Sequence, residues 1–143
     1  MPMTFEDVEQ LATSLPGVTV TTRWANRTYV ANGKGFAWQR PLSKADIKRF
    51  GDETPPAGEI LAVTVENLDA KDALLAIGPP GFFTIQHFNG YAAVLIALRV
   101  AHAKDVRAAI RDAHRLATAA KPTRVRAPKP RKSPARSRQR RST

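Results

Sequence analysis

The chain has 143 residues, of which 43% are hydrophobic, which is enough for one folded domain with a single core. It contains no cysteine, and this excludes disulfide bridges, a thiolate nucleophile and cysteine-ligated zinc or iron–sulfur sites. The formal net charge is +11, and no apolar run approaches the ~20 residues that span a bilayer. We therefore expect a cytoplasmic protein with no membrane partner.

The positive charge is concentrated at the C-terminus. Residues 121–143 hold ten basic side chains and no acidic one, whereas residues 1–120 hold 13 basic and 12 acidic side chains, a balance of +1. Beyond Pro122 the only large apolar residue is Val125, so this segment cannot offset the entropy cost of folding. We predict a folded domain over residues 1–120 and a disordered basic tail over residues 121–143.

The first helix is predicted from its cap. Thr4 followed by Asp7 three residues later has the pattern of a capping box. Met3 and Val8 are spaced for a hydrophobic staple, and Pro16-Gly17 ends the helix.

Three strands are predicted next, over residues 19–24, 27–31 and 35–40, from their β-branched and aromatic residues. Between the second and third strands, Asn32-Gly33 is the dipeptide most typical of a tight hairpin turn. Residues 28–31 should therefore pair with residues 35–40.

The middle of the chain alternates loop, helix and strand. Ser43 followed by Asp46 predicts a short capped helix through Phe50. The continuous apolar run of residues 60–65 predicts a strand without a solvent face. Asp69 is placed to cap a second helix that continues through Ile77.

The stretch Gly81–Leu98 is predicted to be a β-hairpin around which the other elements are arranged. Residues 82–87 alternate as in a strand, Asn89-Gly90 supplies the turn, and residues 91–98 form an apolar run typical of a central strand. This hairpin also carries the most distinctive side chains of the chain, including His87 and Tyr91.

The last predicted helix covers residues 104–119 and is two-faced. Its apolar positions share one side, and basic residues line the opposite side: Lys104, Arg107, Arg111 and Arg115. The order of elements predicts an α+β fold, with a mostly antiparallel sheet and helices packed on one face.

Several segments resemble the MmcQ/YjbR family. They are Leu15-Pro16-Gly17-Val18, Gly33-Lys34-Gly35-Phe36-Ala37, and Phe82-Phe83-Thr84 leading to His87-Phe88-Asn89-Gly90-Tyr91. The resemblance extends from Met3 to about Ala119 and implies a compact domain similar to bacterial frataxin, described as a double-wing fold. Members of the family are commonly called DNA-binding proteins and have no established catalytic residues, so the resemblance implies DNA binding and supplies no catalytic residue for this chain.

The main functional hypothesis is nucleic-acid binding through phosphate contacts, with DNA or RNA as a sequence-independent partner, and with association with the nucleoid. The candidate residues are the basic face of the last helix together with the tail: Lys104, Arg107, Arg111, Arg115, Lys121, Arg124, Arg126, Lys129, Arg131, Lys132, Arg136, Arg138, Arg140 and Arg141. The alternatives are a solvated helix face and a tail that only increases solubility.

A second set of candidates comprises a basic patch and two residues of the hairpin: Arg40, Lys44, Lys48, Arg49, His87 and Tyr91. His87 and Tyr91 would matter if the domain held a small ligand or a weak active site, which requires a polar cleft beside His87. A further alternative is an adaptor whose tail contacts acidic proteins. The sequence indicates no catalytic constellation, cofactor or metal site, and leaves the oligomeric state open.

Overall fold

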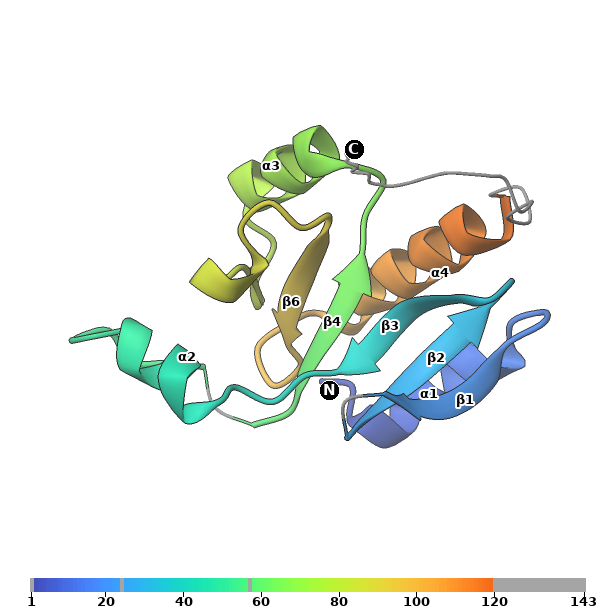
Figure 1. Cartoon of the computed structure of the whole chain (residues 1–143), viewed down its shortest axis with the longest axis horizontal. Coiled ribbons are helices and arrows are strands. Elements are labelled where there is room, and N and C mark those ends of the chain that lie inside the picture. Colours follow the sequence, from blue (N-terminus) through green and yellow to red (C-terminus); the bar gives the residue numbers. More distant parts are fainter. Residues whose placement is uncertain (1, 24, 57, 120–143) are drawn as a thin grey trace.

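The structure is a computed structural model that describes residues 2–23, 25–56 and 58–119 (Figure 1). The elements follow the chain in this order: α1 (Phe5–Ser14), β1 (Thr19–Arg23), β2 (Asn26–Ala31), β3 (Lys34–Gln39), α2 (Lys44–Arg49), β4 (Ile60–Thr64), α3 (Leu68–Ile77), β5 (Phe82–Phe83), the 3-10 turn η1 (Gln86–Phe88), β6 (Ala93–Ala97) and α4 (Ala103–Ala119). None of the helices in these described ranges is long and apolar enough to cross a bilayer. The predicted tail, residues 121–143, lies outside the described residues, as does Trp24.

Six strands form one antiparallel sheet in the order β1-β2-β3-β4-β6-β5. Strand β6 lies between β4 and β5, and all five of its residues are buried, which confirms the prediction of a central strand after the hairpin turn. Strand β4 is also buried at four of its five positions, as its apolar run predicts.

Each face of the sheet has its own hydrophobic cluster. Helices α1 and α4 pack on one face (Figure 1). Val8, Ile110 and Phe36 are fully buried there. These two helices confirm the predicted α+β class with helices on one face. The opposite face is covered by short elements, because Phe88 of η1 and Phe50 beside α2 pack there with Ile60 and other strand residues.

Local sequence signals account for most of the element boundaries. Thr4 forms the predicted capping box with Asp7, and Ser43 forms a second one with Asp46 at the start of α2. Asn32-Gly33 adopts positive φ at both residues, and the flanking strands pair as predicted, with a β-bulge in the register after Tyr29.

Two details differ from the sequence prediction. Helix α3 is capped by the Asn67 side chain, which accepts a hydrogen bond from the Ala70 N–H at 2.8 Å, so the helix begins before Asp69. The predicted hairpin pairs only at β5 and β6, because residues 84–92 leave the ladder. Gly90, at φ 79°, occupies the third position of a turn closed by the Tyr91 N–H and the Phe88 carbonyl.

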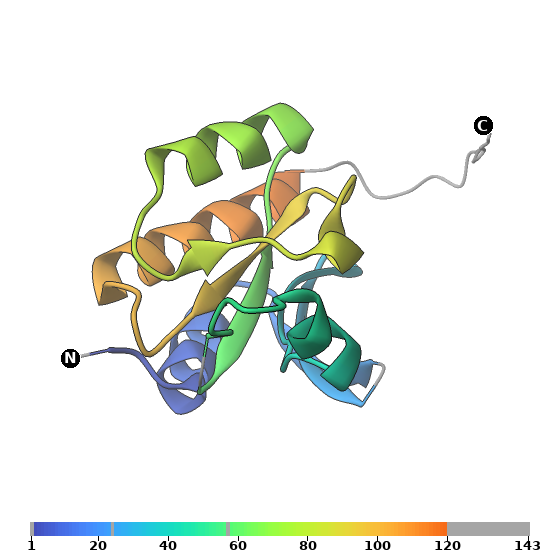
Figure 2. The same ribbon diagram turned by 90° about the vertical axis from the view of Figure 1, so that its left-hand side faces the viewer.

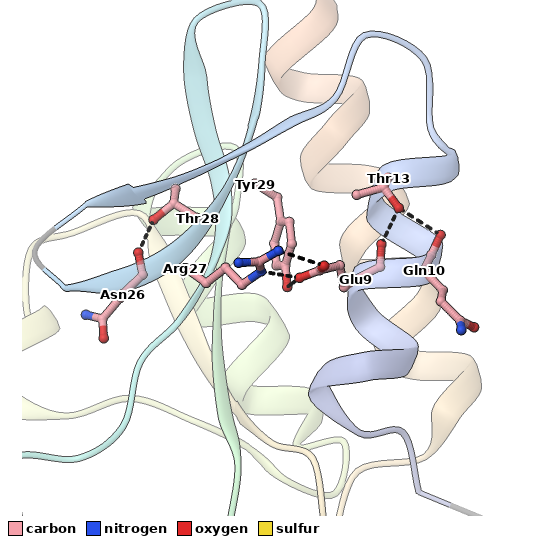
Figure 3. A network of polar contacts seen from close by, with 7 residues as sticks. All are labelled: Glu9, Gln10, Thr13, Asn26, Arg27, Thr28 and Tyr29. Atoms are coloured by element: carbon pink, nitrogen blue, oxygen red, sulfur yellow. Dashed lines mark hydrogen bonds and ion pairs between the residues drawn. The ribbon is translucent and has the colours of Figure 1, made fainter.

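A polar network joins α1 to β2 (Figure 3). The Glu9 carboxylate accepts hydrogen bonds from Nε of Arg27, from its Nη2 at 2.9 Å, and from the Tyr29 hydroxyl at 3.2 Å. The Arg27 hydrogen bond lowers the pKa of Glu9 despite partial desolvation, and burial next to Glu9 raises the pKa of Tyr29 to about 12. Arg27 is therefore a structural cation that neutralises Glu9.

Candidate functional site

A cleft of about 440 Å³ lies on the sheet face opposite α1 and α4. We call it the aromatic cleft. It is lined by Arg23, Asn26, Thr28, Gly35, Trp38, Arg40, His87, Phe88 and Tyr91. Its size is within the range of small-molecule sites in proteins, and it combines aromatic rings with two cations.

Three aromatic rings form one wall of the cleft. Trp38 on β3 lies with its ring centroid 6.4 Å from that of Phe88 and 6.2 Å from that of Tyr91. Phe88 and Tyr91 meet edge to face at 5.6 Å. Phe88 is buried, whereas Tyr91 is 49% exposed, so the cluster has a packed base and an accessible ring on which a planar ligand can stack.

Arg40 is held in a fixed position beside these rings. Its Nη2 lies 3.1 Å from Oδ2 of Asp46, its Nη1 donates to the Pro41 carbonyl at 2.6 Å, and its guanidinium carbon is 5.7 Å from the centre of the Phe88 ring. The side chain is only 16% exposed. An arginine restrained in this way is pre-organised to bind an anion or a planar group, because little side-chain entropy remains to be lost.

Asp46 stays ionised in this arrangement although it is buried. Burial alone would raise the pKa of its carboxyl group, but hydrogen bonds with Ser43 and the positive charge of Arg40 outweigh that effect, and the pKa is lowered overall. The same carboxylate thus caps α2 and holds Arg40.

Arg23 contributes the second cation from the neighbouring edge of the sheet. A Cβ atom added at Gly35 would come within 3.2 Å of the Arg23 Nη1, so the missing side chain at Gly35 makes room for the guanidinium. Arg23 is exposed, and no described residue forms an ion pair with it. Its charge is therefore available to an anionic ligand in the cleft.

Lys71 supports the cleft from behind and was not among the candidates from the sequence. It is 5% exposed, and its Nζ donates to the Phe88 carbonyl at 2.7 Å and to the Tyr91 carbonyl at 2.9 Å. This buried ammonium holds both ends of the turn that carries the two rings. The sequence contains one signal for it: Lys71 shares a helix face with Leu74 and Leu75, where an apolar residue is usual.

The structure brings together three residues of the second candidate set. Arg40, His87 and Tyr91 line the aromatic cleft, whereas Lys44 and Lys48 are exposed on α2, and Arg49 lies 3.8 Å from the Asp46 carboxylate. His87 is exposed at the cleft wall and makes no hydrogen bond or ion pair with another described side chain, so no described group orients it as a general base.

The basic face of α4 lies elsewhere. Its four cations are exposed, as the helical pattern predicts: Lys104, Arg107, Arg111 and Arg115. The Arg115 guanidinium lies 3.3 Å from the Asp112 carboxylate. Because α4 packs on the sheet face opposite the aromatic cleft, these cations and the cleft are separated by the sheet. The remaining nucleic-acid candidates, from Lys121 to Arg141, lie outside the described residues. Among the described residues, no group of three potential metal ligands occurs.

Over the described residues the chain is an α+β protein with a six-stranded antiparallel sheet and four α-helices. Uncharacterized proteins of Mycobacterium bovis and of two strains of Mycobacterium tuberculosis are each 37% identical to it over 113 residues, which cover 77% of this chain and 84% of theirs. The chain belongs to the family of these uncharacterized mycobacterial proteins.

The fold also occurs in a solved structure. The crystal structure of a protein from Pseudomonas syringae, a structural genomics target, superposes with a TM-score of 0.63 at 16% identity and covers 80% of this chain and 99% of that chain. At this identity the likeness shows the shared fold. No family model matches the sequence.

Proposed function

We propose that the protein binds nucleic acid and that an unstacked nucleotide of a single-stranded segment occupies the aromatic cleft. The observation that carries the proposal is the fixed position of Arg40 beside the Trp38, Phe88 and Tyr91 rings. A nucleotide joins a planar base to an anionic phosphate, and the cleft joins aromatic surface to two guanidinium groups. Single strands offer such bases, whereas a duplex keeps them stacked.

In the proposed complex the base stacks on the exposed ring of Tyr91 and the phosphate meets Arg23. Base–aromatic stacking contributes on the order of 1–3 kcal/mol per base and discriminates little between bases. Arg40, already paired with Asp46, presents its remaining N–H groups and its planar face to the ligand. The domain therefore acts as a binding protein, and no catalytic step is part of the proposal.

The other basic regions have a different part in this proposal. The exposed face of α4 and the basic tail attract polyanions without reading bases, with dissociation constants on the order of 10⁻⁴ to 10⁻⁶ M at physiological salt. The resemblance to the MmcQ/YjbR family, whose members are commonly called DNA-binding, supports the same class of function and a place in the cytoplasm near the nucleoid.

A second candidate function uses the same cleft for a free mononucleotide. The buried Phe88 ring in the cleft favours this second candidate, because a single small ligand that reaches it contacts several aromatic rings at once. The two candidates share ligand chemistry and differ in affinity, because a polymer gains additional phosphate contacts outside the cleft.

The test is a binding titration of the full chain, followed by fluorescence anisotropy, with a labelled single strand and the matching duplex. We expect tighter binding of the single strand, and we expect Tyr91→Ala or Arg23→Gln to weaken it about tenfold or more while duplex binding changes little. Arg107→Gln on α4 is the matched control, since it should weaken both ligands equally. Equal affinity for single strand and duplex in the wild type would contradict the proposal, and unlabelled mononucleotide as competitor separates the two candidates.

A further inference from the structure

A second cavity, of about 340 Å³, lies between α3 and α4 on the sheet face that α4 covers. Figure 2 shows the two helices side by side, and we call this cavity the α3/α4 groove. Its floor and walls are mainly apolar and include Val63, Phe82, Val94, Leu74, Ala108 and Leu116. An apolar groove between two helices is a common form of peptide-binding surface.

The rim of the α3/α4 groove is acidic. Glu66, Asp105 and Asp112 line it together with one cation, Arg115, which lies 3.3 Å from Asp112. Glu66 is exposed and has no ion-pair partner among the residues that the structure describes. A groove of this kind suits a segment in which an apolar side chain is flanked by positive charges.

The chain contains such a segment directly after α4. Val125 is the only large apolar residue between positions 120 and 143, and Arg124 and Arg126 flank it. Helix α4 ends at Ala119, three positions after Leu116, which itself lines the groove. The occupant with the shortest path to the groove is therefore the chain's own tail.

The segment between the end of α4 and Val125 is long enough for Val125 to reach the α3/α4 groove. Six residues from Ala119 to Val125 span up to ~20 Å when extended. Returning along α4 from Ala119 to Asp112 needs only ~10 Å, because a helix rises 1.5 Å per residue. Val125 can thus reach the apolar floor while its neighbouring arginines reach the carboxylates.

We propose that the α3/α4 groove binds the C-terminal tail of the same chain, with Val125 in the groove and Arg124 and Arg126 at its acidic rim. In the docked state these arginines face carboxylates instead of phosphates, so docking competes with the attraction of the tail to polyanions. The proposal is independent of the aromatic cleft, which lies on the other face of the sheet.

Cysteine cross-linking of the full chain tests the proposal cleanly, because the natural sequence contains no cysteine. Ala108→Cys in the groove is combined with Val125→Cys, and the control pairs Val125→Cys with Arg107→Cys, one position away on the outward face of α4. Under mild oxidation we expect an intramolecular disulfide to form about tenfold faster in the groove pair than in the control. Equal rates overturn the proposal, and so does a disulfide that forms mainly between two molecules, which would assign the groove to a second copy.

A second measurement uses substitutions in the tail only, so the sequence of the folded domain stays unchanged. Amide resonances of the full chain are compared with those of Val125→Asp, and Ala135→Asp serves as a control with the same change of charge. We expect Val125→Asp to shift the amides of groove residues such as Ala70, Leu74 and Ala108, and we expect the control to leave them in place. Groove amides that respond to neither substitution overturn the proposal.

Discussion

Replacing Lys71 by methionine removes the ammonium that holds the turn between η1 and β6. Its Nζ bridges the carbonyls of Phe88 and Tyr91 at 2.7 and 2.9 Å, and the side chain is 5% exposed. Each carbonyl keeps a backbone donor, the Tyr91 N–H for Phe88 and the Ala93 N–H for Tyr91, so the substitution removes two hydrogen bonds from a charged donor, each worth ~1.5–3 kcal/mol. Methionine recovers part of this loss, because burying an ammonium is itself unfavourable. We therefore expect the free energy of unfolding to fall by about 2 kcal/mol.

Urea unfolding followed by circular dichroism measures this loss, and Lys104→Met on the exposed face of α4 is the matched control. The control should stay within about 0.5 kcal/mol of the wild type, since surface substitutions seldom have larger effects. If Lys71→Met were as stable as the control, the bridge to the two carbonyls would not hold the turn and our reasoning would be refuted.

The same variant has a pH signature. Burial lowers the pKa of Lys71 below its ordinary value of 10.5. The unfolded chain therefore binds this proton more tightly, and the stability of the wild type relative to Lys71→Met should rise as the pH increases from the lowered pKa toward 10.5. Tyr29 titrates in both proteins, so its raised pKa cancels in the comparison. A stability difference that falls over this range would contradict the assignment.

Two further substitutions test other parts of the fold and site. Gly81→Ala should destabilise the protein by ~2–4 kcal/mol in thermal or urea unfolding, because φ is +86° and the added Cβ would come within 2.8 Å of backbone atoms; Gly17→Ala, at φ +72° with open space around it, should cost only about 1 kcal/mol. Asp46→Asn should cost ~1–2 kcal/mol at neutral pH and, by releasing Arg40, weaken the nucleotide binding that we propose for the aromatic cleft. The pKa of Asp46 lies below its ordinary value of 3.8 in the folded state. The higher stability of the wild type over Asp46→Asn should therefore be complete above pH 3.8 and disappear as the pH falls through the folded-state pKa. Melting temperatures of both proteins at two pH values can check this.

The features that the sequence predicts well depend on neighbours a few positions away. The capping boxes at Thr4 and Ser43 and the hairpin turn at Asn32-Gly33 each need only three or four residues to act. Strand β6 was predictable for a different reason, because an uninterrupted apolar run has no solvent face to present. Each of these signals is local or compositional, so it can be recognised in the sequence without knowledge of the tertiary structure.

The features that the sequence predicts less well depend on contacts between residues that are far apart in the chain. Alternation from Phe82 to His87 is typical of a strand, yet only two of these residues pair as β5. The carbonyls of Phe88 and Tyr91, which follow this stretch, are held by Lys71, 17 and 20 positions away. The candidate site shows the same limit. Arg40, His87 and Tyr91 were candidates individually, but their common cleft depends on strand order and on Arg23 lying over Gly35.

The proposed binding of a nucleotide in the aromatic cleft is tested most directly by a titration that maps the bound surface. Single-stranded oligonucleotide is added to the full chain while side-chain resonances are followed by nuclear magnetic resonance. We predict the earliest and largest shifts at the Trp38 indole and the Arg23 and Arg40 guanidinium groups. Shifts confined to α4, with the three cleft side chains unmoved, would contradict the account and leave phosphate contacts as the only mode of binding.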